Sequence, residues 1–160
     1  MAIVTFYGKP DCINNTRQKA LLQASGHHVI ARDLLIEPWT PEQLYLFFAG
    51  LPVTQWFNPT ARAITTGLVL PAQLNIEIAL DLMVIDPGLI RRPLLQVADQ
   101  RQVGFDPDII ARWIGLSTTA LVKTGISKTR ISKTGISPTD LTLCPKAPVR
   151  SFATGGASLA

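Results

Sequence analysis

The sequence predicts an α/β protein in which a β-α-β unit, a group of helices and a β-β-α unit follow one another. Extended, helical and extended patterns over residues 2–33 indicate the first unit, and two strand patterns with a helix over residues 94–114 indicate the last. Between them, threonine and proline residues mark the starts of further helices. With 160 residues, 47% of them hydrophobic and 16% charged, the chain is long enough to bury a core.

The β-α-β unit follows from apolar patterning and from one glycine. The run AIVTFY at residues 2–7 is typical of a buried strand, and HVIARD at residues 28–33 is a second extended run. Helical spacing of apolar residues covers residues 14–25, and Gly26 is a natural helix end. We therefore expect two parallel strands joined by a right-handed crossover.

The helices of the middle segment are predicted from their first residues. Thr40 can cap a helix and Pro41 suits the first helical position, so a helix is expected to about Phe48. A longer helix is expected from Pro71 or Ala72 to about Asp86. The apolar side of that helix would consist of Leu74, Ile78, Leu82 and Ile85.

The last unit completes the predicted fold. Residues 94–97 are predicted to form a strand and residues 102–105 its hairpin partner, while Asp106-Pro107 begins a helix to about Ile114. The order β-α-β, helical insertion, β-β-α is that of a thioredoxin-like fold. We assign this α/β domain to residues 1–116.

Residues 117–160 differ from this domain in charge and pattern. Residues 1–116 contain nine Lys/Arg and ten Asp/Glu, whereas residues 117–160 contain six Lys/Arg and a single acidic residue, Asp140. Residues 123–142 are four copies of a five-residue repeat, KTGIS, KTRIS, KTGIS and PTDLT. Four such copies are too few to bury a core. We expect a disordered C-terminal tail over residues 117–160, and the repeat is explained more simply by expansion of a short DNA repeat than by a selected binding tail.

Composition excludes several classes of function. The sequence pI of 9.4 belongs to the tail, and no basic face with interleaved aromatic residues precedes residue 117, so nucleic-acid binding is not expected. The sequence has no apolar run long enough to span a membrane, no secretory signal pattern and only two cysteines, which together predict a cytoplasmic protein. His27-His28 has no partner at metal-ligand spacing, so no metal site is expected and the pair is interpreted as structural.

Cys12 is the candidate reactive residue. It follows the first strand and precedes the first helix by one or two residues, where free backbone N–H groups and the helix dipole favour a thiolate. Such positions lower a cysteine pKa from about 8.5 to roughly 3.5–7.5. Asn14, Asn15 and Arg17 add polar and cationic groups in the first turn, whereas Asp11 adds a neighbouring negative charge.

The motif Cys-Ile-Asn-Asn lacks a second cysteine three positions after Cys12. A redox cycle at Cys12 would therefore need an external thiol such as glutathione, or Cys144 from the tail. The alternative interpretation is that Cys12 is a small structural residue where a strand meets a helix.

Pro93 is the second informative residue. In thioredoxin folds a proline at the start of the third strand, usually cis, lies against the active cysteine, although the sequence leaves the isomer open. Arg91 and Arg92 precede it, and a guanidinium at this place is suited to holding an oxyanion. An ordinary basic loop is the other interpretation of these two arginines.

These motifs carry a family resemblance over about residues 2–116. The segments FYGKPDCINNTRQKALL, ARDLLIEPWT, WFN, DPGLIRRPLL and VGFD resemble the ArsC/Spx family, which comprises glutaredoxin-dependent arsenate reductases and relatives that do not reduce arsenate. Within this family, the chain is similar to the branch described as nitrogenase-associated proteins. The resemblance implies that Cys12 corresponds to the nucleophilic cysteine of the reductases, and Arg92 to one of their oxyanion-binding arginines.

The sequence also departs from the reductase pattern. Two further arginines of that pattern are replaced here by Trp56-Phe57-Asn58, with Arg62 nearby, and by Phe105-Asp106, with Arg101 as the nearest substitute. An arsenate dianion needs several convergent donors, each worth roughly 1.5–3 kcal/mol, so their loss argues against arsenate reduction.

Three functions follow as hypotheses. The first is a nitrogenase-associated accessory protein with monothiol redox chemistry at Cys12, without a bound cofactor and with glutathione as co-substrate. Its expected partners are a glutaredoxin or a nitrogenase-related protein, and we expect a monomer. The alternatives are a glutathione- and glutaredoxin-dependent arsenate reductase, and a non-catalytic protein-binding module.

Overall fold

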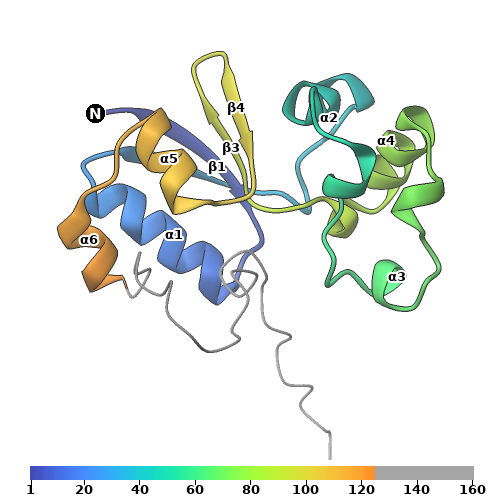
Figure 1. Ribbon diagram of the computed structural model, residues 1–160, viewed down its shortest axis with the longest axis horizontal. Helices are drawn as coiled ribbons and strands as arrows, with labels where there is room; N and C mark the ends of the chain where they lie inside the picture. Colours follow the sequence, from blue (N-terminus) through green and yellow to red (C-terminus); the bar gives the residue numbers. More distant parts are fainter. Residues whose placement is uncertain (125–160) are drawn as a thin grey trace, which may run out of the picture.

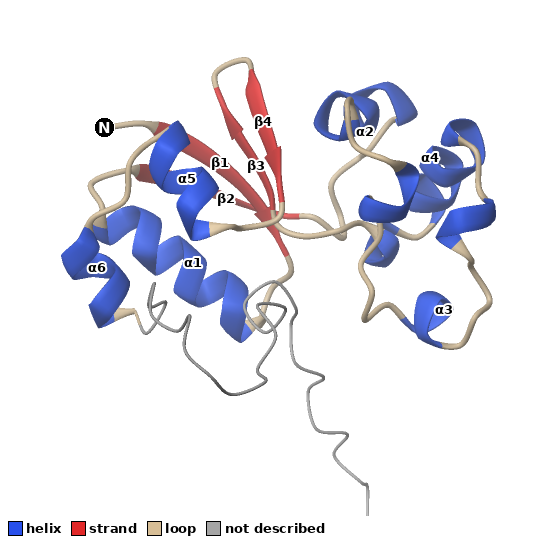
Figure 2. Ribbon diagram, viewed as in Figure 1, coloured by secondary structure: helices blue, strands red, loops and turns tan. Residues whose placement is uncertain are grey.

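The computed structural model describes residues 1–124 of the chain, and four of its strands form one sheet in the order β2-β1-β3-β4 (Figure 2). The strands are β1 (Ile3–Gly8), β2 (His28–Asp33), β3 (Leu94–Val97) and β4 (Gln100–Val103). Strand β1 pairs in parallel with β2 and antiparallel with β3, and β4 is antiparallel to β3. The predicted thioredoxin-like α/β fold is confirmed, and each strand begins within two residues of its predicted start.

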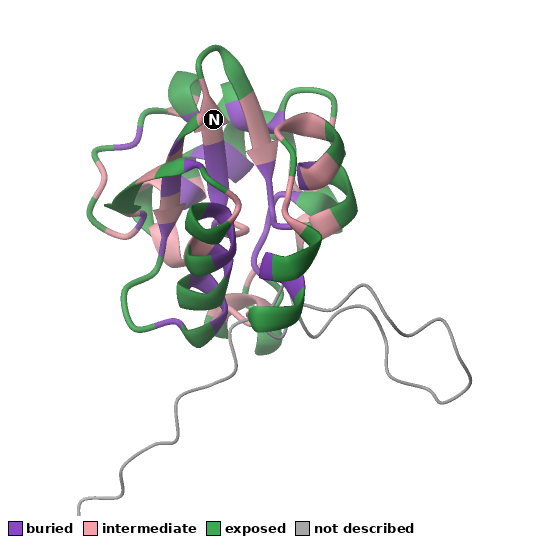
Figure 3. Ribbon diagram, turned by 90° about the vertical axis from the view of Figure 1, so that its left-hand side faces the viewer, coloured by how far each residue is buried: buried purple, intermediate pink, exposed green. Residues whose placement is uncertain are grey.

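Three helices, α1 (Ile13–Ala24), α5 (Pro107–Trp113) and α6 (Thr118–Lys123), lie on one side of the sheet (Figure 1). Because side chains alternate along a strand, Val4 and Phe6 of β1 point to this side and are buried. Figure 3 shows buried residues concentrated where the strands and helices meet. The buried apolar cluster of this region consists of Val4, Phe6, Leu21, Leu22, Leu95, Phe105, Ile110, Ala120 and Leu121.

A buried histidine joins the two ends of this region. The Nδ1 atom of His27 accepts a hydrogen bond from the backbone N–H of Ala2 (3.2 Å), and its Nε2 lies 2.7 Å from the carbonyl oxygen of Gly115. These contacts tie the chain before β1 to the segment between α5 and α6. The structural interpretation of His27 is therefore supported by its two hydrogen bonds.

The segment between β2 and β3 forms the helical insertion, which lies beside the sheet in Figure 1. Its elements are α2 (Pro41–Phe48), η1 (Val53–Gln55), α3 (Arg62–Thr65), η2 (Pro71–Gln73), α4 (Ile76–Ile85) and η3 (Pro87–Leu89). Thr40 caps α2 as predicted: its Oγ1 accepts from the N–H of Gln43, and the Gln43 side chain accepts in return from the N–H of Thr40.

The insertion has its own core of aromatic and aliphatic side chains. Trp56 is 1% exposed and stacks on Phe48 with 5.0 Å between ring centroids. The buried members of this cluster are Leu34, Trp39, Leu44, Phe47, Phe48, Trp56, Phe57, Ala79, Leu80, Met83, Leu89, Ile90, Leu94 and Val103. Leu94 and Leu95 are neighbours on β3 yet belong to the two different cores, so β3 connects them.

The predicted helix from residue 71 or 72 to 86 is shorter in the structure. Residues 71–73 form a separate 3₁₀ turn, and α4 begins only after Asn75, whose side chain accepts from the N–H of Ile78. The predicted apolar side is also wrong in part, because Ile78 and Ile85 are 48% and 79% exposed. The side that faces the core instead carries Ala79, Leu80 and Met83.

The structured region extends beyond the predicted boundary at residue 116. Ser117 caps α6, and Ala120 and Leu121 of this helix are buried against the core of the sheet region. The expectation of disorder is therefore wrong for residues 118–123, where apolar contacts compensate for the loss of chain entropy. The rest of the predicted tail, with most of the repeat and Cys144, lies outside the described residues. Within residues 1–124, no helix has the length and apolar character needed to cross a membrane.

Candidate functional site

The loop between β1 and α1 places Cys12 at the start of the helix. Asp11 adopts a left-handed backbone conformation (φ 59°), and Cys12 follows as the N-cap with an extended backbone. The Cys12 carbonyl accepts hydrogen bonds from the N–H (2.9 Å) and the Oγ1 (3.1 Å) of Thr16. Cys12 is 3% exposed and lies beside the first turn of α1, and the predicted effect of the helix dipole on its sulfur stays a prediction.

Asn15 anchors this loop to the helix. Its Oδ1 accepts a hydrogen bond from the N–H of Lys9 (3.0 Å), and its Nδ2 donates to Oε1 of Gln18 (2.9 Å). Gly8 permits this approach, because a Cβ added there would lie 2.9 Å from the Asn15 Oδ1. Both the Oδ1 and the Nδ2 of Asn15 thus form hydrogen bonds within the protein, and these bonds position the Cys12 loop. Asn14, the other predicted asparagine, is buried beside it.

The sheet register brings the Pro93 segment next to the Cys12 loop. Tyr7, near the end of β1, pairs with Leu94, and the Pro93 carbonyl accepts from the N–H of Gly104. Pro93 comes directly before Leu94. It therefore lies near the end of β1, where the chain enters the loop that carries Cys12. The Arg92–Pro93 bond, which the sequence left open, is cis. In Figure 1 the end of β1, the start of α1 and the start of β3 meet between the sheet region and the insertion.

The two arginines before Pro93 have different surroundings. Arg91 joins the insertion to the sheet region: its N–H donates to the Trp56 carbonyl (2.8 Å) and its Nη1 to the Gln55 carbonyl (3.3 Å). Burial lowers the pKa of Arg92 from its ordinary value, because a partly desolvated guanidinium holds its charge less readily. A half-buried cation without a carboxylate partner in the described chain is suited to an anionic group.

Arg17 belongs to α1 and follows Cys12 by five residues. The Arg17 side chain is exposed. The structure therefore brings Cys12, Asn14, Asn15, Arg92 and Pro93 into neighbouring segments and leaves Arg17 on the helix surface.

The residues at or near the places of the two missing arginines have contacts of their own. Asn58 is 5% exposed, and its side chain donates to the Gly88 carbonyl and accepts from both the N–H and Oγ1 of Thr60. Arg101 packs its guanidinium over the ring of Phe47 at 5.7 Å and donates to the Asp99 carbonyl. Arg62 is exposed on α3. None of these contacts joins Asn58 or Arg101 to the Cys12 loop.

Sequence reasoning missed two structural features of the site and a cavity outside it. The anchoring role of Asn15 and the bridging role of Arg91 depend on contacts between segments far apart in the chain, and no local pattern predicts them. A cavity on the other side of the sheet, lined by Tyr7 and Arg101 among others, was also missed. One signal for it was present: Tyr7 alternates with Val4 and Phe6 along β1 and so faces away from α1.

Comparison with known proteins identifies relatives of this chain. The sequence profile of the ArsC family matches residues 7–113. A curated Rhodospirillum rubrum protein, described as an uncharacterized 15.7 kDa protein in the draG 3' region, is 52% identical over 116 residues, covering 72% of this chain and 81% of that protein. The global transcriptional regulator Spx of Enterococcus faecalis is 29% identical, covering 70% and 86% of the two chains.

Two solved structures have the same fold. An arsenate reductase from Vibrio cholerae superposes with a TM-score of 0.60 at 22% identity, covering 69% of this chain and 97% of that one. An arsenate reductase related protein from Brucella melitensis has a TM-score of 0.51 at 26% identity, covering 71% and 94%.

Fold and site together define a thioredoxin-like protein with a cysteine at the start of its first helix and a cis-proline segment beside that helix. The match of the family profile to two thirds of the chain adds the particular family. This chain belongs to the ArsC family.

Proposed function

We propose that this protein is a thiol redox accessory protein in which Cys12 exchanges disulfides with an external thiol, with glutathione as co-substrate. The position of Cys12 supports the proposal: it lies at the N-terminus of α1, in the loop that follows β1, and β1 pairs with the strand that begins after cis-Pro93. In this position the helix dipole stabilises a thiolate, which is the nucleophile in disulfide exchange.

The chemistry needs one cysteine and two equivalents of glutathione. In its reduced form the Cys12 thiolate attacks one sulfur of a disulfide R–S–S–R, forming Cys12–S–S–R and releasing R–S⁻. A glutathione thiolate then attacks the sulfur of R, which restores the Cys12 thiolate and forms glutathione–S–S–R. A second glutathione reduces that product to R–S⁻ and glutathione disulfide, so the two electrons come from glutathione. A glutaredoxin could take the place of the first glutathione.

The donor groups at the site favour this reaction over arsenate reduction. An oxyanion that loses its hydration needs several convergent cations. In the described chain Arg92 is half-buried beside Pro93, whereas Asn58 is occupied by Gly88 and Thr60 and Arg101 lies over Phe47. We therefore do not propose arsenate as the substrate, although structures of arsenate reductases share the fold.

For the biological setting, we propose the cytoplasm and a role as a monomeric accessory protein of nitrogen fixation, with a glutaredoxin or a nitrogenase-related protein as partner. Support comes from the resemblance of FYGKPDCINNTRQKALL and LIRRPLL to the nitrogenase-associated branch. A deletion strain tested for growth on dinitrogen and on ammonium examines this setting: a defect confined to dinitrogen supports it, and equal growth on both contradicts it.

Disulfide exchange at Cys12 is tested directly with purified protein. A Cys144→Ser variant is reduced, mixed with glutathione disulfide at several pH values, and followed by intact-protein mass spectrometry. We expect one glutathione adduct, formed faster at pH 7 than on an unstructured peptide containing the same cysteine. The Cys12→Ser, Cys144→Ser double variant should form none.

Two results would reject the proposal. An adduct rate no higher than that of the peptide would mean that Cys12 is structural. Arsenate-dependent consumption of glutathione in the presence of glutaredoxin, lost in Cys12→Ser, would identify the enzyme as a reductase instead. If Cys12→Ala preserved partner binding and the growth phenotype, the third hypothesis, a non-catalytic binding module, would replace both.

A further inference from the structure

The cavity lined by Tyr7 and Arg101 lies between the sheet and α2, and its lining includes no residue of the Cys12 loop. It measures about 140 Å³, which is on the order of five water molecules. Its walls come from β1, the segment after β2, α2, β3 and β4. The lining residues are Tyr7, Glu37, Trp39, Gln43, Leu46, Phe47, Gln96 and Arg101.

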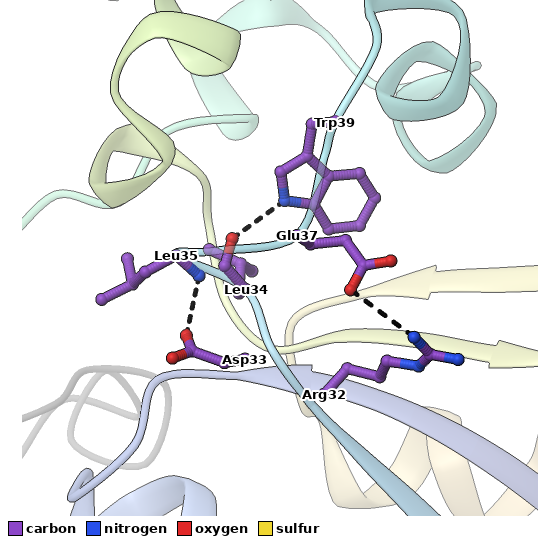
Figure 4. Close-up of polar contacts among 6 residues, drawn as sticks. All are labelled: Arg32, Asp33, Leu34, Leu35, Glu37 and Trp39. Carbon is purple, nitrogen blue, oxygen red and sulfur yellow. Dashed lines mark hydrogen bonds and ion pairs between the residues drawn. The ribbon is translucent and has the colours of Figure 1, made fainter.

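Three aromatic rings form one wall of this cavity. The ring centroids of Tyr7 and Trp39 are 5.0 Å apart, those of Tyr7 and Phe47 5.8 Å, and those of Trp39 and Phe47 6.0 Å. The indole N–H of Trp39 donates to the Leu34 carbonyl, which fixes the orientation of its ring (Figure 4). Rigid aromatic walls with a few polar groups are typical of small-molecule sites.

Two opposite charges line the same cavity from different sides. Glu37 follows β2 and Arg101 belongs to β4, the two edge strands of the sheet, and both side chains line this cavity. Within residues 1–124 they form no ion pair with each other. Glu37 makes a long contact of 4.0 Å with the exposed Arg32, which a stronger cationic partner can displace (Figure 4).

The donors of Arg101 are incompletely used. Its Nη1 donates to the Asp99 carbonyl, and its charge lies over the ring of Phe47. The Nε is buried and has no acceptor among the described residues, an arrangement that costs free energy. Nε and Nη2 lie side by side on one edge of a guanidinium, the edge with which arginine can bind a carboxylate through two hydrogen bonds.

The charges of Glu37 and Arg101 both act on the phenol of Tyr7. Its pKa is raised from the ordinary value, first by burial and then by Glu37, while Arg32 and Arg101 act in the opposite direction. Its hydroxyl is therefore within electrostatic reach of the acidic and the basic side of the cavity. A neutral phenol between them can donate to a carboxylate or accept from an ammonium group.

We propose that this cavity binds a small zwitterion, a molecule of amino-acid size whose carboxylate pairs with Arg101 and whose ammonium group pairs with Glu37 against the aromatic wall. Ammonium groups bind favourably over aromatic faces, and carboxylates form charge-assisted hydrogen bonds with arginine. The cavity volume limits the ligand to a few non-hydrogen atoms. The proposal does not depend on the chemistry at Cys12.

The test uses L-alanine and two fragments of it, ethylamine and propionate, as probes. Each is titrated into the uniformly ¹⁵N-labelled full chain while the Trp39 indole N–H and the Arg101 Nε–H signals are followed by NMR, the two signals being assigned with Trp39→Phe and Arg101→Gln. We expect saturable shifts with L-alanine in the millimolar range, and binding about tenfold weaker or more for each fragment, as the loss of a charge-assisted hydrogen bond predicts.

Substitutions locate the site. Glu37→Gln and Arg101→Gln are each expected to weaken L-alanine binding about tenfold or more, and Arg112→Gln, an exposed arginine of α5, should leave it unchanged. If Arg101→Gln lowers stability, Glu37→Gln carries the test, because Glu37 belongs to neither core. The proposal is overturned if L-alanine causes no saturable shift, if propionate binds as well as L-alanine, or if Glu37→Gln has no effect.

Discussion

The sheet region and the helical insertion are stabilised in different ways. The sheet region is built on three strand pairings and the twelve-residue helix α1, so its backbone groups are paired over long regular stretches. The insertion consists of six helical pieces of three to ten residues, none long enough to be stable alone. Its short elements depend on large buried side chains such as Trp56 and on polar contacts such as those of Asn58.

This difference bears on the position of the candidate site. The Cys12 loop is anchored to the sheet region through Asn15, whereas Arg91 connects the Pro93 segment to the insertion through Gln55 and Trp56. One side of the site, the Cys12 loop, is therefore held by the sheet region, and the other side, the Pro93 segment, is also held by the insertion. A change in the insertion core should alter the Pro93 side while leaving the Cys12 loop in place, unless the two regions unfold as one unit.

The largest expected effect is that of Trp56→Ala. Trp56 is 1% exposed, stacks on Phe48 and donates from Nε1 to the Leu51 carbonyl at 2.9 Å. Removing it should lower the free energy of unfolding by about 3–5 kcal/mol, the range for loss of a buried aromatic side chain. Urea denaturation under reducing conditions, followed by far-ultraviolet circular dichroism, measures this loss.

Trp113→Ala is the matched control in the sheet region. Trp113 is only partly buried, and its Nε1 donates to Oε1 of Gln100. We expect Trp113→Ala to lower the free energy of unfolding by less than half as much as Trp56→Ala does. Because Leu94 and Leu95 join the two cores, both variants should still unfold in a single transition; a separate early transition in Trp56→Ala would show that the insertion unfolds alone.

The next largest effect concerns the ends of the sheet region. His27→Ala removes the acceptor of the Ala2 N–H and the partner of the Gly115 carbonyl, and should cost about 2–3 kcal/mol. Hydrogen exchange should increase most over residues 114–124, where α6 begins. His28→Ala is the neighbouring control, because His28 is exposed and should change stability little. Equal effects of the two variants would contradict the bridging role of His27.

Local signals in the sequence were sufficient for most of the fold. Alternation and turn residues located the strands, and Thr40 with Pro41 located α2, because these signals act over a few neighbouring residues. The start of α4 was predicted at Pro71 or Ala72, but Asn75 is the residue that caps the helix. Only two of its ten residues, Glu77 and Asp81, are charged, so periodicity could not indicate which side faces the core.

The candidate site was predictable only where its residues are close in sequence. Cys12 and Asn15 follow a recognisable strand and turn, and the pairing of β1 with β3 accounts for Pro93. The place of Arg101 could not be predicted, because it depends on α2 of the insertion bringing Phe47 over the sheet. Arg17 was assigned to the site by its distance in sequence; it is exposed on α1, and its role at the site stays a prediction.

A smaller effect is expected in the titration of Tyr7. Glu37→Gln removes a negative charge that raises the Tyr7 pKa, so the pKa should fall toward its ordinary value. A raised pKa means that the neutral phenol stabilises the fold below about pH 10 and that this contribution is lost as pH rises through the folded-state value. In Glu37→Gln the loss should be complete at a lower pH and be smaller in total. NMR of the Tyr7 ring carbon measures the shift; an unchanged pKa would mean that Glu37 does not face the cavity.

The smallest effect lies within the sheet region, where a turn and a helix should respond to the same substitution with opposite signs. Ala98, in the turn between β3 and β4, has φ 49°, a left-handed conformation that disfavours a side chain by about 1–2 kcal/mol. Ala98→Gly removes that strain but increases the entropy of the unfolded chain, so we expect a net stabilisation of about 0.5–1 kcal/mol.

Ala20→Gly, on the exposed side of α1, should instead destabilise by about 0.5–1 kcal/mol, because glycine disfavours a helix interior. Thermal unfolding of the two variants and the unchanged protein shows which substitution stabilises the fold and which destabilises it. A loss of stability in Ala98→Gly would mean that chain entropy, and not backbone conformation, dominates at this turn.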